Sequence, residues 1–248
     1  PGTYNLISTG DEDIFISKLD ASGKFIWAKQ IGGNFSDDVV SALAVDTSGN
    51  VYTTGRFNNT ADFDPGPATF NLSSFGNSYD IFVSKLDSSG KFIWTKQLGG
   101  TSEDYSYGIA IDLSGNIFTT GYFRNTADFD PGAGTFNLLI GGMFISKLNP
   151  SGNFVWANGM GGTGTGSEIG RAIAIDAKKN VYIAGRFSET VDFDPNSGVF
   201  NLTSSNGYYN DVFILKLDAS GNFIWATNMG GANNDEVYSI VLDAGGNI

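Results

Sequence analysis

The sequence repeats itself, and this repetition limits the folds open to the chain more than any other feature. The segment DIFISKLDASGKFIWAKQIGG at 13–33 returns, with few changes, at 80–100, 143–162 and 211–231. Four tryptophans mark a period of about 66 residues: Trp27, Trp94, Trp156 and Trp225. Self-similarity at a fixed period predicts a tandem-repeat architecture in which each unit packs on its neighbours.

Each unit has the pattern of β-strands joined by tight turns. In IAIDLSGNIFTTG at 109–121, two β-rich runs flank a polar turn with a glycine, which predicts a hairpin. A second hairpin is predicted around 87–90. The run at 14–19 carries apolar residues on both faces, a pattern typical of a sheet that is covered on both sides. No segment has the length, period and caps of a helix.

These features predict an all-β fold, namely a β-propeller built from four-stranded antiparallel blades. A propeller blade usually takes about 40–45 residues, so roughly 20 residues of each unit remain. They lie between the second and third strands of a blade and predict an insertion there. A β-helix is the rival architecture, but its rungs are shorter and do not call for one tryptophan in every unit.

The repeat phases set our expectation for the domain. We expect a single propeller domain over 1–248, or a window on a longer propeller array whose other repeats and domains are partners of this one. Complete blades are expected at about 40–98, 106–160 and 169–229. The runs at 13–33 and 237–248 are predicted to join as a split fourth blade.

Composition excludes several classes of function. The chain has 14 Lys and Arg against 26 Asp and Glu, a net charge of −12, which disfavours binding to the phosphate backbone of nucleic acids. It contains neither cysteine nor histidine, so disulfides, thiolate nucleophiles, Ser-His dyads and ordinary zinc sites are excluded. No run of about 18 apolar residues is present, so we expect no membrane insertion.

The segments DIFISKLDASGKFIWAKQIGG, AIDLSGNIFTTGYF and ADFDPG together resemble the SBBP-type β-propeller repeat. They particularly resemble versions from large secreted and surface proteins of Bacteroidota-like bacteria. The resemblance covers essentially the whole chain. It implies an extracellular, cell-surface location, many tandem units and, often, a sorting domain for type IX secretion. It supplies no catalytic residues, and we expect that the chain is not an enzyme.

A recurrent DFDP motif places two carboxylates two residues apart in three units. Alternate residues of an extended chain share a face, so each pair can converge on one hard cation such as calcium. The alternative is a tight turn, because Asp-Pro-Gly favours one. The predicted metal ligands are Asp62, Asp64, Asp128, Asp130, Asp192 and Asp194.

A second series of acids stands eight residues before the aspartate that ends each first strand. If the first strand is innermost, these carboxylates ring one mouth of the central channel, where they can bind a cation or a polyhydroxylated ligand. The alternative is a loop acid that accepts backbone N–H groups. The residues are Asp38, Asp104, Glu168 and Asp235.

Two further residue types recur inside apolar runs. The lysine of the third strand, for example Lys85, must reach the edge of the blade or pair with a carboxylate such as the aspartate of the first strand. The tryptophan of the fourth strand is interpreted as a plug in the core or between blades, because its neighbours are apolar.

The sequence therefore predicts a non-catalytic extracellular scaffold or binding module for adhesion or display, with calcium as a stabiliser. A surface glycan or a protein is the expected partner. One alternative is a lectin-like propeller with an equivalent pocket in each blade. Another is a carbohydrate-active propeller, which needs two carboxylates that do not repeat.

Overall fold

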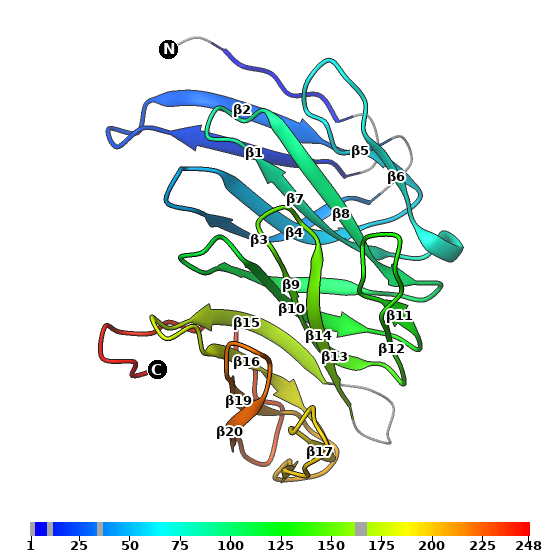
Figure 1. Cartoon of the computed structure of the whole chain (residues 1–248), viewed down its shortest axis with the longest axis vertical. Coiled ribbons are helices and arrows are strands. Elements are labelled where there is room, and N and C mark those ends of the chain that lie inside the picture. The colour runs from blue at the N-terminus through cyan, green and yellow to red at the C-terminus, as the bar shows by residue number, and fades with distance from the viewer. Residues whose placement is uncertain (1–2, 9–11, 34–36, 162–167) are drawn as a thin grey trace.

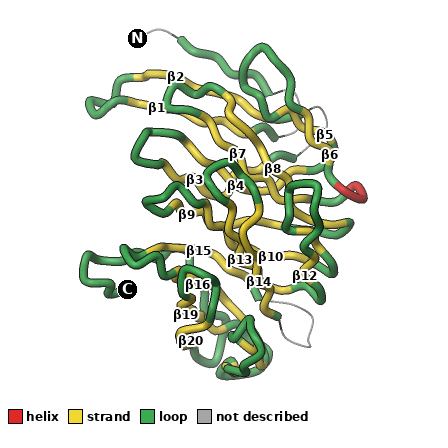
Figure 2. Tube along the Cα trace, viewed as in Figure 1, coloured by secondary structure: helices red, strands yellow, loops and turns green. Residues whose placement is uncertain are grey.

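The computed structural model describes residues 3–8, 12–33, 37–161 and 168–248, and its regular structure is almost entirely β-strand (Figures 1 and 2). The one exception among the described residues is a single 3-10 turn, η1 (Phe75–Asn77). The strands are rich in Val, Ile, Thr, Phe and Tyr, the residues that suit a pleated and packed surface. The structure confirms the all-β fold and blades of four antiparallel strands; two blades are separate sheets, and the other lies within a six-stranded sheet.

Three such sheets, which we call blades 1 to 3, follow one another along the chain. Blade 1 contains β3 (Val39–Val45), β4 (Val51–Phe57), β7 (Asp80–Leu86) and β8 (Phe92–Gly100). Blade 2 contains β9 (Tyr105–Ile111), β10 (Ile117–Phe123), β13 (Gly142–Leu148) and β14 (Phe154–Met160). Blade 3 contains β15 (Ile169–Ile175), β16 (Val181–Phe187), β19 (Asp211–Leu217) and β20 (Phe223–Met229). In each blade, strands that follow one another pair antiparallel.

Polar turn residues explain where the strands end. Between β9 and β10, the carboxylate of Asp112 accepts backbone N–H bonds from Ser114 at 2.8 Å and Asn116 at 2.9 Å. Gly115 in this turn has φ 79°, a conformation that costs glycine little. The same aspartate turn recurs in blades 1 and 3, which is why the hairpins could be predicted from the sequence.

The middle strands of the blades are buried on both faces, except that β19 of blade 3 is buried on one face and half-buried on the other. Almost every side chain of β4, β10 and β16 is buried, as are those of β7 and β13. This burial requires neighbouring blades to cover each sheet, as the apolar runs predicted. The blades stack in chain order (Figure 1), and the first strands β3, β9 and β15 lie next to one another.

The predicted split fourth blade is not formed in this structure. β1 (Ile14–Leu19) and β2 (Phe25–Ile31) make a two-stranded sheet of their own, and residues 237–248 form no strand. The two segments lie at opposite ends of the stack (Figure 1), so they do not meet. Without a second strand beside β1, Phe15 is 67% exposed, whereas Phe82 at the same repeat position is fully buried.

The extra residues of each unit form a small hairpin, and two of the three hairpins pair with the sheet that precedes their blade. The hairpins are β5 (Thr60–Asp62) with β6 (Asn71–Ser73), β11 (Ala127–Asp128) with β12 (Asn137–Leu138), and β17 (Thr190–Asp192) with β18 (Asn201–Thr203). β11 of blade 2 pairs with the end of β8 in blade 1, Ala127 opposite Gly100. A bridge between Gly32 and Asp62 repeats this arrangement one junction earlier. The insertions therefore fasten blade 2 to blade 1, and blade 1 to the sheet of β1 and β2.

The phenylalanine inside the DFDP motif anchors the hairpin in the core. Phe129 is fully buried, and its ring lies 5.7 Å from that of Phe123 and 4.8 Å from that of Phe144. Its equivalents, Phe63 and Phe193, are also fully buried and meet the corresponding rings. The sequence analysis attributed the role of this motif to its two aspartates. In the structure, its most buried residue is the phenylalanine between them.

Replacing Phe129 with alanine tests this anchor. We expect the Phe129→Ala variant to lose about 3–5 kcal/mol of unfolding free energy, because it leaves a large cavity under the hairpin. Phe75→Ala is the control, since that ring is half exposed and its loss leaves no interior cavity. Urea unfolding followed by tryptophan fluorescence measures both. Equal losses in the two variants would contradict the anchoring role.

Candidate functional site

The paired acids of the DFDP motif lie in turns at the junctions between blades. Asp128 Oδ1 accepts backbone N–H bonds from Asp130 at 2.9 Å and Phe136 at 2.8 Å, and Asp130 Oδ1 accepts one from Gly132 at 2.8 Å. The equivalent bonds are made by Asp62, Asp64, Asp192 and Asp194. The alternative weighed for these acids, a turn, is thus present in all three units.

Calcium at these six aspartates stays a prediction. Each carboxylate has one oxygen engaged by the turn, and calcium takes about 6–8 oxygen ligands. Within the described residues, no group of three or more acidic side chains surrounds a common point. A calcium ion at a DFDP turn would need most of its ligands from other oxygens.

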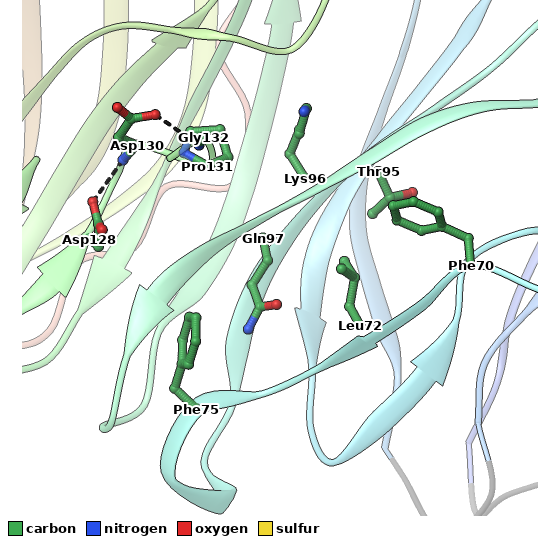
Figure 3. A pocket seen from close by; sticks show the side chains of 10 residues that line it. All are labelled: Phe70, Leu72, Phe75, Thr95, Lys96, Gln97, Asp128, Asp130, Pro131 and Gly132. Carbon is green, nitrogen blue, oxygen red and sulfur yellow. Dashed lines mark hydrogen bonds between the residues drawn. The ribbon is translucent and has the colours of Figure 1, made fainter. Parts of the chain in front are cut away.

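A half-open pocket of about 330 Å³ lies between blade 1 and the DFDP turn of blade 2 (Figure 3). Lys96 and Gln97 from β8 form one side, and the turn that carries Asp128 and Asp130 stands opposite them. The remaining lining residues are Phe70, Leu72, Phe75, Thr95, Pro131 and Gly132. The pocket therefore combines aromatic rings, an amide, an ammonium group and carboxylates.

The same position is hollow at the preceding junction. That pocket, of about 180 Å³, is lined by Asp13, Gln30 and Gly32 and by the turn Asp62, Asp64, Pro65 and Gly66. Gln30 and this turn occupy the repeat positions of Gln97 and the turn of the larger pocket. A pocket between a fourth strand and the next DFDP turn is therefore a recurring feature of the repeat.

The second series of acids lies in the crossover between blades, and most of it is buried. Asp104 Oδ2 accepts the N–H of Gly100 at 2.7 Å, Oδ1 accepts that of Arg124 at 3.0 Å, and its own N–H donates to Tyr79. Asp38 and Asp235 accept the equivalent glycine N–H groups, and Asp38, Asp104 and Glu168 are buried. The structure thus places Asp38, Asp104 and Asp235 in the backbone-bonding role given as their alternative, and a ligand-facing role stays a prediction for all four acids.

Sequence reasoning missed the acids that these crossover residues meet. Asp80, at the start of β7, is fully buried, and its Oδ1 and Asp104 Oδ2 both lie close to the position that a Cβ atom on Gly99 would take. Asp13 and Asp211 hold the same repeat position as Asp80 and pack against Gly32 and Gly230. The sequence did carry a signal for these acids: the repeated segment begins with an aspartate in three of its four copies and ends with two glycines.

Burial changes the acid strength of this pair. Removal from water raises the pKa of Asp80 to about 7, although bonds from Phe75 and Gln97 act in the opposite direction. Removal from water also raises the pKa of Asp104 to about 7, and the nearby charge of Asp80 contributes to the rise. Both side chains are fully buried, so a substrate of the size of a sugar does not reach them.

The recurrent lysines and tryptophans also connect blades. The Nζ atoms of Lys85, Lys147 and Lys216 stand 4.7–4.9 Å from the ring centroids of an aromatic residue on the second strand. Lys147 donates to the carbonyl oxygen of Ala219 at 3.0 Å in blade 3, and Lys18 donates to that of Ser88 at 2.8 Å in blade 1. The expected carboxylate partner is thus replaced by a ring and a carbonyl of the next blade.

The tryptophans fill the same junctions. A Cβ atom on Gly90 would lie 3.1 Å from the indole of Trp27, and one on Gly152 would lie 3.3 Å from that of Trp94. Each indole therefore packs against a glycine in the turn of the next blade, and a side chain there would push the blades apart. This geometry agrees with the interpretation of the tryptophan as a plug between blades.

Comparisons with known proteins support the repeat family. Residues 26–64 and 93–122 match the family model SBBP, described as a beta-propeller repeat. The first match runs from β2 through β3 and β4 into the DFDP turn, and the second runs from β8 through the crossover into β10. The matched segments therefore include the crossover acids Asp38 and Asp104.

Two curated relatives match most of this chain. One is an uncharacterized WD repeat-containing protein of Acanthamoeba polyphaga mimivirus, 28% identical over 93% of this chain and 19% of its own length. The other is the regulatory protein FlaEY of Caulobacter vibrioides, 25% identical over 95% of this chain and 25% of its own length. The chain thus spans a quarter or less of the curated relatives it matches.

A solved structure of a protein of unknown function from Bacteroides caccae was also matched. It covers 90% of this chain and 92% of its own chain, at 8% sequence identity and a TM-score of 0.26. At that score the superposition does not define a shared fold. No helix within the described ranges is both long enough and apolar enough to cross a membrane.

Substitution of Asp128 tests whether its carboxylate stabilises the turn only or also binds calcium. Asp128→Ala leaves two backbone N–H groups without their acceptor, and we expect it to lower the unfolding free energy by about 1–3 kcal/mol. Asp128→Asn keeps an acceptor oxygen and should cost much less. Urea unfolding with EDTA and with calcium measures both variants. A loss in Asp128→Asn that occurs only with calcium would show that the carboxylate binds the ion.

The buried acid pair predicts the pH dependence of stability in metal-free buffer. Asp80 and Asp104 titrate near pH 7 when folded and near 3.8 when unfolded, so the folded state binds more protons between those values. The unfolding free energy should therefore fall as the pH rises from about 4 to about 7, and stay lower above it.

Urea unfolding with EDTA across this range checks the expectation. Asp80→Asn should flatten the fall, because the side chain no longer ionises. Asp20→Asn is the control, since Asp20 lies in an exposed turn where a bond from Ser22 lowers its pKa. A curve for Asp80→Asn that parallels the parent chain would contradict the assignment.

Proposed function

We propose that this chain is a non-catalytic extracellular repeat scaffold and binding module that serves adhesion or display at a bacterial cell surface. The observation that most supports the proposal is that its candidate features recur from junction to junction. The pocket beside Gln97 has a counterpart beside Gln30, and the acids at both belong to the repeat. Equivalent weak sites at fixed spacing suit multivalent attachment, in which linked contacts raise the overall affinity.

The positions of the acidic side chains support the proposal that the chain is not an enzyme. A glycosidase needs two carboxyl groups about 5–10 Å apart on either side of the bond it cleaves. In the pocket, Asp128 and Asp130 each use Oδ1 to hold the turn, and both recur in the other units. Asp80 and Asp104 are closed off from solvent. This arrangement favours binding over the alternative of a carbohydrate-active propeller.

A lectin-like role is the second candidate, and the lining of the larger pocket favours it. Phe75 is half exposed at this pocket, and a sugar ring can stack on such a face. Asp128, Asp130 and Lys96 offer polar groups to hydroxyls of a surface glycan. A protein loop with polar and aromatic residues is the other class of partner that this lining suits. In either case, calcium at the DFDP turns would act as a stabiliser of the pocket wall.

Binding to immobilised glycans tests the function. We expect the whole chain to be retained on multivalent bacterial-surface polysaccharides and only weakly on single sugars, with no release of reducing ends. Phe75→Ala should reduce retention several-fold. The matched control is Ile93→Ala, which removes an exposed apolar side chain from β8 outside the pocket.

The outcomes separate the candidates. Release of sugar products would make the chain an enzyme and overturn the proposal. Equal retention of the two variants would show that the pocket is not the binding site. Retention on a surface protein, and on none of the glycans, would favour adhesion through a protein partner over the lectin-like role.

A further inference from the structure

Asp80 is fully buried, yet only one of its carboxylate oxygens has a hydrogen-bond partner. Oδ2 accepts the backbone N–H of Phe75 at 2.9 Å and the side-chain amide of Gln97 at 2.5 Å. Oδ1 is buried and has no partner within the described residues. An interior carboxylate oxygen without a partner carries a large desolvation cost, so this atom calls for a ligand that the described residues do not provide.

Asp104 brings a second carboxylate to the same place. A Cβ atom on Gly99 would lie 2.9 Å from Asp104 Oδ2 and 3.1 Å from Asp80 Oδ1, so both oxygens converge on the bare side of this glycine. Gly99 has φ 144°, where residues with a side chain are strained. The glycine thus leaves free the space between the two acids.

No basic side chain of the described structure neutralises the pair. The ion pairs found there join Arg124 to Glu103 and Arg186 to Glu236, and neither includes Asp80 or Asp104. Two buried carboxylates at close range repel each other, and a bound proton or a cation relieves that repulsion. Because the chain has no histidine or cysteine, only oxygen ligands are offered, and these suit a hard cation.

The same pair of repeat positions holds aspartates in blade 3 and in the segment that follows it. Asp211 is fully buried, its Oδ2 accepts two bonds from Ser205, and its Oδ1 has no partner within the described residues. Asp235 occupies the position of Asp104. Both junctions also leave a buried serine hydroxyl unpaired, at Ser74 and at the equivalent Ser204. Repetition of the same unpaired oxygens indicates a site that belongs to the repeat.

We propose that a divalent cation of the size of calcium binds between Asp80 and Asp104, and a second one between Asp211 and Asp235. The two carboxylates supply the negative charge, and water and neutral oxygens complete the shell. In blade 1 the ion links β7 to the crossover that leads into blade 2. This site differs from the DFDP turns and does not depend on the proposed function.

One junction of the chain provides an internal contrast. At the position of Asp80, blade 2 has Gly142, and its crossover acid is Glu168 in place of an aspartate. A single carboxylate remains there, so the pair that defines the site is missing. The proposal therefore assigns no such ion to the junction between blades 2 and 3.

Terbium luminescence and thermal melts of the whole chain test the proposal. Tyr79 and Tyr105 are the sequence neighbours of the two aspartates, and their ring centroids lie 5.7 Å apart, so they can sensitise a terbium ion at this site. We expect terbium emission that is lost when calcium displaces the terbium. We also expect a melting midpoint that is several degrees higher in millimolar calcium than in EDTA. Asp80→Asn should lower both responses, while its acceptor oxygen still bonds Phe75 and Gln97.

The double variant Asp62→Asn with Asp64→Asn is the matched control, because it removes two charges at a DFDP turn, one more than Asp80→Asn removes. It should keep the emission and the shift in midpoint. Responses that vanish in this control and persist in Asp80→Asn would overturn the proposal. An unmodified chain that shows neither response would also overturn it, because the unpaired oxygens would then hold water or a proton only.

Native mass spectrometry of the unmodified chain keeps the proposal testable if Asp80→Asn does not fold. We expect two calcium ions that survive transfer from calcium buffer and are absent after EDTA. A chain without bound calcium would contradict the proposal whatever the behaviour of the variants.

Discussion

Each sheet of this protein must bury both of its faces, and the rest of the structure depends on that constraint. A four-stranded sheet whose middle strands are apolar on both sides cannot be covered by its own hairpins, so only a neighbouring sheet can cover it. Each blade is therefore stable only as part of a stack. The open edge beside β1 shows what happens when this covering is missing, because Phe15 there stays exposed.

Because the blades must cover one another, the specific side-chain interactions lie mostly at the junctions between them. Lys147 reaches a ring of its own blade and a carbonyl of the next, Trp94 packs on Gly152 of the next turn, and Phe129 inserts under a hairpin that crosses back. The acids gather there as well, since Asp80 and Asp104 meet beside Gly99. Stability and candidate chemistry thus occupy the same surface, and a ligand held at a junction would also join two blades.

Particular residues show why a pattern can indicate importance without indicating a role. The DFDP aspartates repeat, and the sequence allowed either a metal or a turn; the structure has the turn, because Asp128 Oδ1 lies within 2.9 Å of two backbone N–H groups. The crossover acids repeat too, but a ring at a channel mouth was only one of their two interpretations. Asp80 was not selected at all, because nothing in one strand tells which residue of a distant crossover it will meet.

The sequence by itself determined the repeat, the all-β fold, the positions of the hairpins and the insertion, and the absence of thiol and imidazole chemistry. These properties follow from local pattern and composition, since turn residues and alternating apolar runs act over a few positions. Only the tertiary structure decided which carboxylates are buried, which meet each other and which cap turns. Those outcomes depend on how two blades about 66 residues apart in sequence come together, and on desolvation, which a residue acquires only when its neighbours are in place.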